Sequence, residues 1–396
     1  MTPMGEAILR ALWMAFAMGW EILWPLVLGF FLSAVVQAVV SHREIGRLLP
    51  DDRPRSIAMA MLLGAASSSC SYAAVALARA IFLKGANFTA AMAFQLASTN
   101  LVAELGIILA VLMGWQFTLA EFAGAPVMIV ILVLLFRAFL SPRLLREAKA
   151  QAERGRHGRM EGHADMDMSV KSEAPIWKRI ASPEGFTAIS HYFVMDWASV
   201  WIDVGGGLLI AGALAAWVPP SFWQAFFLSD DPVLAKFWGP LIGPVVAIVS
   251  FVCSVGNVPL AAVLWNGGAS FGGVIAFIFA DLIVLPVLDI YRKYYGWKMA
   301  GFLLVTFYAA MVAASLIVEF VFGWLGLVPQ GRQAQIVETS ITWNYTTILN
   351  IIFLALAAVL VWRFLRTGGP AMLHQMNATP GAGADGAHRP DHAHRA

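Results

Sequence analysis

The sequence predicts an all-α integral membrane protein made of two inverted repeats, each with a broken or re-entrant helix hairpin. In total it predicts about seven full spans and two hairpins. Three observations predict this fold. Hydrophobic residues make up 60% of the 396 residues, charged residues only 13%, and the mean hydropathy is +0.73. One segment occurs twice in the chain, and basic residues gather in some loops between apolar stretches but not in others.

The repeated segment begins at the two cysteines of the chain, Cys70 and Cys253, and runs for 25 residues in each copy. At a constant separation of 183 positions, both copies share Cys-Ser, a Val, an Ala, Gly-Ala, a Phe and Ala-Phe. Internal repeats of this kind mark a duplicated architecture. One thiol in each copy predicts that the two halves meet at this segment.

Long apolar stretches predict the membrane elements, since about 18 apolar residues are enough to indicate a span. We expect an interfacial N-terminal helix at 1–17, membrane repeat 1 at 18–137 and a cytoplasmic basic linker at 138–185. Membrane repeat 2 follows at 186–325, an external loop and final span at 326–366, and a disordered cytoplasmic tail at 367–396. The individual elements are expected at 18–40, 57–83, 88–113, 115–137, 186–218, 237–266, 270–290, 299–325 and 342–366.

The basic loops predict the topology. Lys and Arg gather in 41–56, 137–185 and 291–298 and are scarce in 219–236 and 326–341, so the first group is expected in the cytoplasm. Loops 41–56 and 137–185 then lie on one side although three apolar elements separate them, so one of these elements does not cross. The best candidate is 57–83, because a serine-rich break leaves arms of about 13 residues, each about 20 Å long against a core of about 30 Å.

The same reasoning makes 237–266, broken at its cysteine, a hairpin that enters from the external side. The alternative is that both segments are kinked spans. Broken helices leave backbone groups that need protein or a water-filled cavity at membrane depth, and such breaks are typical of secondary transporters. The candidate substrate-binding residues therefore lie at or near the breaks: Ser69, Cys70, Ser71, Asn100, Cys253, Ser254 and Asn257.

The two cysteines have two readings. Thiolates are ligands for soft ions and metalloids, so both could line one cavity. A free Cys is also commonly a small, buried and inert packing residue.

Acidic residues inside apolar stretches are the candidates for carrying a coupling proton, because ionisable groups are costly at membrane depth. Asp281 is favoured because it lies mid-span, opposite Ser98 in the repeat alignment. Glu104 follows Asn100 by four residues and is expected on the same helix face, and Asp203 precedes three glycines. The alternative for these acids is structural pairing with polar neighbours.

Other charged residues have plainer expected roles. Glu121, Asp196 and Asp289 lie nearer the ends of their spans and are expected to reach toward the membrane surface. Arg79 either holds an anionic substrate or, as we favour, reaches the cytoplasmic headgroups. Histidines in the segment 157–168 and in the tail suit at most loose metal binding.

Several function classes are excluded by missing motifs. The chain has no Walker A sequence, no His-Glu metalloprotease motif and no nucleophile elbow, so we expect neither an ATPase nor a hydrolase. We expect no enzymatic activity, no cofactor, no resident metal ion and no nucleic acid. The expected partners are the lipid bilayer and a small-molecule substrate, and the oligomeric state stays open.

The chain resembles the predicted-permease family that includes bacterial organoarsenical efflux permeases. The resemblance rests on the Cys-Ser turn, the Gly-Ala-x-Phe step, the Ala-Phe pair and Thr99-Asn100, and covers roughly 18–137 and 190–325. The second copy is the closer match, since Ala76 of the first copy stands where the second has Pro259.

The resemblance implies a multi-pass permease of the inner (plasma) membrane, with trivalent methylated arsenic as the leading substrate and arsenic resistance as the role. We expect export of this or another small soft or thiol-reactive solute, driven by protons. The alternatives are a permease for another sulfur-containing or metal-related solute, and a membrane thiol redox protein in which Cys70 and Cys253 form a reversible disulfide.

Overall fold

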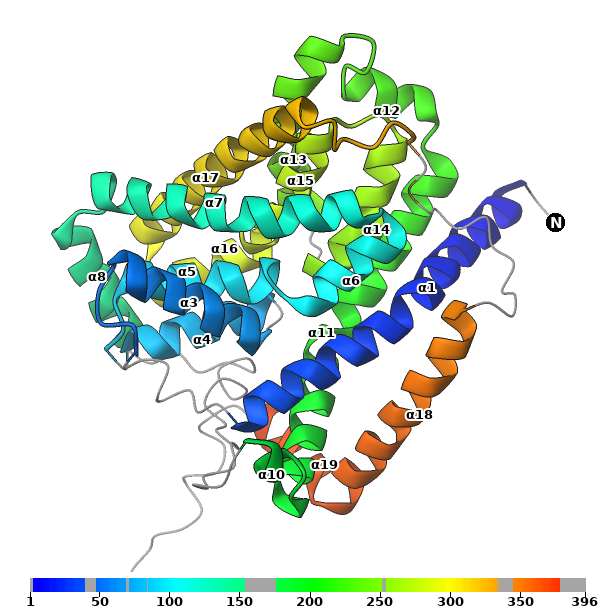
Figure 1. The fold of residues 1–396 in the computed structure, drawn as a ribbon. Helices are drawn as coiled ribbons and strands as arrows, with labels where there is room; N and C mark the ends of the chain where they lie inside the picture. Colours follow the sequence, from blue (N-terminus) through cyan, green and yellow to red (C-terminus); the bar gives the residue numbers. More distant parts are fainter. Residues whose placement is uncertain are drawn as a thin grey trace, which may run out of the picture.

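In the computed structural model the described residues are 3–39, 48–68, 71–83, 85–153, 176–250, 254–332, 334 and 345–377, and no strand occurs among them (Figure 1). The predicted all-α membrane fold class is confirmed. The described chain has six helices that are long and apolar enough to cross a membrane. The number is seven if the bent helix α1 (Pro3–Val39) is counted as a single span. The six are Phe88–Leu112, Trp115–Phe139, Pro232–Ser250, Phe271–Tyr295, Trp297–Trp324 and Thr346–Arg366.

The helices of the two halves follow the same order. After α1, the first half has α3 (Pro54–Ser67), α4 (Ser71–Leu83), α5 (Phe88–Asn100), α6 (Ala103–Leu112) and α7 (Trp115–Phe139). The second half has α11 (Pro183–Trp217), α13 (Pro232–Ser250), α14 (Ser254–Asn266), α15 (Phe271–Phe279), η1 (Ala280–Leu282), α16 (Leu285–Tyr295) and α17 (Trp297–Trp324). The remaining helices are α8 (Pro142–Glu153), α10 (Ile176–Ile180), α12 (Pro220–Phe226), α18 (Tyr345–Arg366) and α19 (Gly369–Asn377).

Both ends of the chain depart from the expected segmentation. Helix α1 runs through the expected interfacial helix and the first span, with a bend of 47° between Met4–Trp20 and Ile22–Val35. Helix α19 occupies the first part of the tail that composition predicts to be disordered, and residues 378–396 lie outside the described residues. Helix α18 packs beside α1 and α11, outside the two repeated sets of helices (Figure 1).

The sequence repeat has a counterpart in the helices. Helices α4 and α14 have 13 residues each, and both their first and their last residues are 183 positions apart. The turn that follows is the same in both copies, with Gly85 at φ 105° and Gly268 at φ 112°. Each of these glycines donates its N–H to the carbonyl three residues earlier, at 3.1 Å in both copies. Only glycine adopts such a φ without steric cost, which accounts for the shared Gly-Ala step.

Equivalent helices of the two halves pack in opposite directions. Gly212, late in α11, lies against Ala11, early in α1, whereas the Ser33 hydroxyl, late in α1, lies 3.3 Å from the Asp196 carboxyl in the first half of α11. Helices α7 and α17 are also antiparallel, with contacts between Gly124 and Val318 and between Phe136 and Phe302. This is the arrangement that an inverted repeat requires.

The arms of each broken element return to the end from which they started. The Asn87 N–H after α4 donates to the Leu49 carbonyl before α3, at 2.8 Å. In the second half, the Ser229 hydroxyl before α13 donates to the Gly268 carbonyl after α14, at 2.9 Å. Both pairs of helices are therefore hairpins in the structure, in line with the first of the two readings of the sequence.

The two hairpins open toward different ends of the molecule. Near the base of α3–α4, Asp52 pairs with Arg137 at 2.7 Å, and Glu147 of α8 pairs with Lys298 at 3.0 Å. These contacts gather the basic loops at one end, which we call the basic end. The base of α13–α14 instead meets the 326–334 segment, where Arg332 donates to the Trp265 carbonyl at 3.2 Å. We call this the opposite end.

The break between α5 and α6 follows from the local sequence. At the end of α5, Ser98 donates to the Gln95 carbonyl at 2.8 Å, and Thr99 and Asn100 both donate to the Leu96 carbonyl, at 3.2 and 3.1 Å. Side chains that bond nearby carbonyls compete with the helical backbone, and Val102 is accordingly extended. Pro286 lies in the first turn of α16, where its missing N–H costs no hydrogen bond, and its ring prevents η1 and α16 from forming one continuous helix.

Small residues allow the hairpins to approach the helix that follows them. A Cβ added at Gly64 of α3 would lie 2.4 Å from the Phe94 carbonyl oxygen of α5. A similar contact in the second half, one turn earlier on both helices, places a Cβ at Gly243 of α13 2.4 Å from the Gly273 carbonyl oxygen of α15. Close backbone approach through small residues is a common way in which helices associate in membranes.

We expect Gly64→Val to destabilise the protein by about 1–3 kcal/mol or more, because the added atoms would push against backbone rather than a movable side chain. Gly323→Val is the matched control, since a Cβ there meets no heavy atom within 4 Å. The measurement is the thermal unfolding midpoint of both variants in detergent. Equal midpoints would show that α3 and α5 are not packed as described.

The hairpins also predict the sidedness of introduced cysteines. In a chain with Cys70→Ser and Cys253→Ser, we expect Lys84→Cys, after the first hairpin, to react with an impermeant maleimide from the cytoplasm. We expect Asn266→Cys, at the end of the second hairpin, to react only from outside. Labelling of both from the same side would contradict hairpins that open to opposite sides of the membrane.

Candidate functional site

The Asp281 carboxyl lies at a contact between the two halves of the chain. Asp281 belongs to η1 in the second half, and the Ser71 hydroxyl at the start of α4 donates to its Oδ2 at 2.8 Å. Thr99 and Asn100, at the end of α5, lie near this carboxyl. All four side chains are fully buried. The start of α4, the end of α5 and the short helix η1 thus meet at one acid in the interior of the protein.

Several buried polar atoms of the described chain have no hydrogen-bond partner. Asp281 Oδ1 and Asn100 Oδ1 have no hydrogen-bond partner within the described chain. The same holds for both amide atoms of Asn257 in α14 and both carboxyl oxygens of Glu121 in α7, and each of these side chains is fully buried. Buried polar groups are nearly always hydrogen-bonded, so such atoms call for a ligand, a water or an ion.

A second polar cluster holds the tip of the first hairpin. Ser33 of α1 donates to the Ser68 carbonyl at 2.8 Å, and the Ser68 hydroxyl donates to the Glu104 carboxyl at the start of α6. Gln37 donates to Asp196 Oδ2 at 3.1 Å, and Ser33 reaches the same oxygen at 3.3 Å. Ser68, at φ 34°, is one of two non-glycine residues with positive φ in the described chain. The hydrogen bonds of this cluster support that conformation.

The residues predicted from the sequence divide between these places. Ser71, Asn100 and Asp281 come together, whereas Glu104 lies in the second cluster, and Asn257 is buried in α14. Ser69, Cys70 and Cys253 lie outside the described residues, as do the side chains of Ser254, which begins α14, and Asp203 in α11. The predicted roles of these residues stay predictions.

Three expectations about single residues are wrong. Glu104 does not share a helix face with Asn100, because the chain breaks at Leu101–Val102 between them. Glu121 and Asp196 do not reach the membrane surface, since their exposed fractions are 0% and 7%. Asp289, by contrast, is half exposed and pairs with Arg292 and Lys293, as its place near a span end predicts.

The favoured expectation for Arg79, that it reaches the cytoplasmic headgroups, is wrong, and its holding an anionic substrate stays a prediction. Its guanidinium donates to the Ala152 carbonyl of α8 at 2.6 Å and lies over the Tyr294 ring, 4.6 Å from the ring centre. The side chain is 8% exposed. Arg79, in α4, therefore contacts both α8 and α16 and does not extend to the headgroups.

Sequence reasoning missed Ser33, Gln37 and the buried role of Glu121. Ser33 and Gln37 stand four residues apart in an apolar helix, a spacing that puts both on one face and could have marked that face as buried. Glu121 lies six residues after the start of α7. Its position along the chain therefore predicts a place near the membrane surface, and nothing in the local sequence indicates that other helices bury it.

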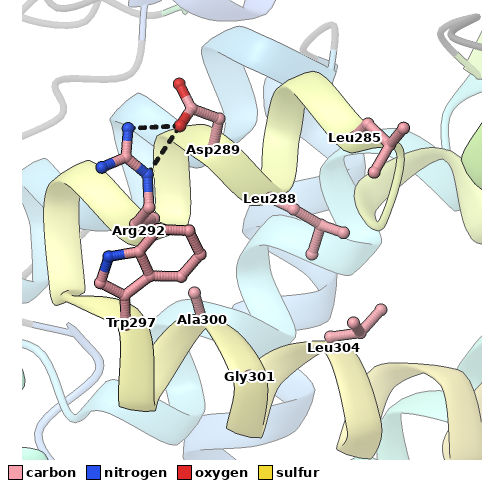
Figure 2. Close-up of a pocket in the computed structure, with 8 residues that line it drawn as sticks. All are labelled: Leu285, Leu288, Asp289, Arg292, Trp297, Ala300, Gly301 and Leu304. Carbon is pink, nitrogen blue, oxygen red and sulfur yellow. Dashed lines mark hydrogen bonds and ion pairs between the residues drawn. The ribbon is translucent and has the colours of Figure 1, made fainter.

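One well-formed groove lies away from this site. It has a volume of about 330 Å³ between α16 and α17, with Leu285, Leu288 and Leu304 along it and the Asp289–Arg292 pair at one end beside Trp297 (Figure 2). Leu285 and Trp297 are 46% and 76% exposed, so the groove faces outward. Its outward, largely apolar lining separates it from the buried carboxyl cluster.

No group of three or more His, Cys, Asp or Glu side chains with metal-binding geometry occurs in the described part of the chain. The histidine-containing segment 157–168 lies outside the described residues, as do most of the tail histidines. Loose metal binding there stays a prediction.

Comparison with known proteins gives the following matches. The model of a family described as predicted permease matches residues 8–320. A Mycobacterium tuberculosis H37Rv protein named "Putative permease Rv2963" is 63% identical over 347 residues, which cover 88% of this chain and 86% of that protein. The Escherichia coli K12 protein "UPF0718 protein YraQ" is 24% identical over 195 residues, 45% of this chain and 53% of that protein. No solved structure matches the chain.

Proposed function

Because the chain belongs to the family of predicted permeases, we propose that it exports a small soft or thiol-reactive solute in exchange for protons. That it is a multi-pass membrane transporter follows from the family and from its apolar helices. The proposal concerns the solute, the direction and the driving ion.

The observation that carries the proposal is the hydrogen bond between Ser71 and Asp281, which joins one half of the chain to the other. In transporters with inverted repeats, the two halves rock against each other around a site near the middle of the membrane. A lone carboxylate is costly in such a place, so an acid that alternates between a buried and an open state is suited to bind and release a proton. Asp281 is fully buried, and its carboxyl makes this contact between the halves.

The solute class rests on chemistry next to the same site. Cys70 directly precedes Ser71 in the chain, and Cys253 precedes Asn257 by four residues. Thiolates bind soft metal ions and metalloids. Trivalent methylated arsenic is such a solute, and the resemblance to organoarsenical efflux permeases implies it as the first candidate. We therefore propose Cys70 and Cys253, with Ser69, Ser71, Asn100, Ser254 and Asn257, as the substrate-binding residues.

The test is uptake of methylarsenite into everted membrane vesicles, with and without an imposed proton gradient. We expect gradient-dependent uptake by the unaltered protein, and loss of that uptake in Cys70→Ser/Cys253→Ser. Ser315→Ala is a control for a conservative change at a buried position, because its hydroxyl bonds only within α17.

The outcomes separate the parts of the proposal. Uptake that survives the double substitution would reject thiol ligation but keep the transported solute. Uptake that ignores the gradient would reject proton coupling. Absence of uptake in the unaltered protein would reject methylarsenite as the solute.

A further inference from the structure

A file of buried polar side chains runs through the interior on both sides of Asp281. It consists of Glu121 in α7, Asp281 in η1, Tyr291 and Tyr295 in α16, and Arg79 in α4. The first three are fully buried, and Tyr295 and Arg79 are 2% and 8% exposed. Ionisable residues such as Glu121, Asp281 and Arg79 are rare inside membrane proteins and often mark an ion or proton path.

Toward the basic end, the file continues from Asp281 along α16. Tyr291 follows Asp281 by ten residues and lies on α16, and its hydroxyl accepts a hydrogen bond from Gln95 of α5. Gln95 is one helical turn before Thr99, which borders the Asp281 carboxyl. The Tyr291 and Tyr295 rings are 6.4 Å apart between their centres, and the Tyr295 hydroxyl has no partner within the described chain.

Beyond Tyr295 the file reaches the surface helix α8. The Tyr295 ring contacts Tyr294 at 6.2 Å, Arg79 lies over Tyr294, and Arg79 donates to the Ala152 carbonyl of α8. The basic loops gather at this end through the Glu147–Lys298 pair of the same helix. The tyrosines thus connect the Asp281 region with the basic end.

Toward the opposite end, Glu121 is the next polar group. Gly124, one turn later in α7, packs against the ring of Phe279, which lies two residues before Asp281. Phe117, one turn before Glu121, packs against Trp265 and Phe271 at the base of the second hairpin. Glu121 therefore lies between Asp281 and the opposite end.

We propose that this file is a proton relay in which Asp281 exchanges its proton with the basic end through Tyr291 and Tyr295, and with the opposite end through Glu121. The relay rests on the proposed proton coupling. Each hydroxyl or carboxyl takes up a proton on oxygen and releases one, so O–H bonds form and break in equal number and no electrons are transferred. The oxygens of Tyr295, Glu121 and Asp281 without partners in the described chain are free to bind water, and such water would carry the proton across the gaps.

Two separate exits suit a carrier better than one continuous channel. A rocking motion that opens the contact between the halves would connect Asp281 with one exit at a time, whereas a permanent path would dissipate the gradient. The relay therefore makes Glu121 and the two tyrosines part of the coupling machinery, beyond the residues that touch Asp281.

The test measures the proton on Asp281 directly and needs no transported solute. The full chain in nanodiscs is moved from H₂O to D₂O, and infrared difference spectra follow the deuterium shift of the Asp281 carboxyl band, assigned as the band missing in Asp281→Asn. We expect Tyr291→Phe/Tyr295→Phe and Glu121→Gln each to slow the shift partly. With all three changes combined, it should be slower by at least about tenfold, because positioned proton-transfer groups contribute rate factors of this size or larger.

The matched controls remove the same chemical groups elsewhere. Tyr308→Phe deletes a hydroxyl that donates to the Leu241 carbonyl, and Glu319→Gln changes a buried carboxyl that accepts from the Gly272 N–H. Neither should alter the exchange rate. An unchanged rate in the triple variant, in protein with a normal thermal midpoint, would overturn the relay and leave Asp281 as the proton carrier. Absence of any Asp281 carboxyl band across the pH range would overturn both.

Discussion

Asp281→Asn is expected to abolish proton-driven accumulation while leaving the exchange of solute across the membrane intact. Asparagine keeps an oxygen that can accept the Ser71 hydrogen bond, so the contact between the halves is retained. It cannot bind and release a proton. One elementary charge moved through 100 mV is worth about 2.3 kcal/mol, which corresponds to an accumulation ratio of about fiftyfold for each coupled proton.

The measurement compares two modes in the same everted vesicles. Net accumulation of methylarsenite under a proton gradient should fall to the level without a gradient, whereas exchange of external for internal solute at equal concentrations should persist. Exchange needs both the site and the rocking motion but no net proton movement, so it reports that the variant is folded and active.

Asp289→Asn is the matched control for this change. The two acids are eight residues apart in the same half, but Asp289 is half exposed and its carboxylate pairs with Arg292 at 2.6 Å and Lys293 at 2.7 Å. We expect accumulation close to that of the unaltered protein, because exposed ion pairs contribute little. Accumulation that persists in Asp281→Asn would move the coupling proton to another acid.

The sequence was informative about elements that depend on local pattern. The repeat around Cys70 and Cys253 predicts the two hairpins, and the helices after both cysteines match at their first and last residues. Local chemistry explains this success, since the turn glycines at 85 and 268 and the apolar stretches act over a few residues. Asp281 could be selected because its depth follows directly from its position in one span.

Contacts between distant segments could not be predicted in the same way. The positions of Asp196 and Glu121 along the chain predict that both lie near the membrane surface. In the structure, other helices bury both side chains. The hydrogen bonds of Asp196 come from α1, about 160 positions earlier in the sequence, and depend on the antiparallel packing of α1 and α11. A single sequence shows how polar a residue is but not which helix will face it.

Glu104 provides the second large expected effect, and its chemistry differs from that of Asp281. Its carboxyl accepts a hydrogen bond from the Ser68 hydroxyl at the tip of the first hairpin, and Ser68 has a backbone conformation that few non-glycine residues adopt. We propose that Glu104 anchors the tip. Glu104→Ala would leave a buried hydroxyl without its acceptor, at a cost of about 1–3 kcal/mol, and would free the tip from α6.

Two substitutions at this position separate anchoring from proton coupling. Glutamine retains an oxygen that can accept from Ser68 but cannot carry a proton, whereas alanine removes both properties. Under the anchoring proposal, Glu104→Gln keeps proton-driven methylarsenite accumulation near that of the unaltered protein, and Glu104→Ala lowers both accumulation and the thermal midpoint.

The same pair of variants tests the prediction that Glu104 couples protons. Equal loss of accumulation in Glu104→Gln and Glu104→Ala, with an unchanged midpoint in the glutamine variant, would assign a proton to Glu104 and contradict a purely anchoring role. Because the Ser68–Glu104 and Ser71–Asp281 hydrogen bonds lie on either side of one hairpin tip, movement of that tip would alter both acids together. If Glu104 anchors the tip, Glu104→Ala should therefore also slow solute exchange. Asp281→Asn should not slow it.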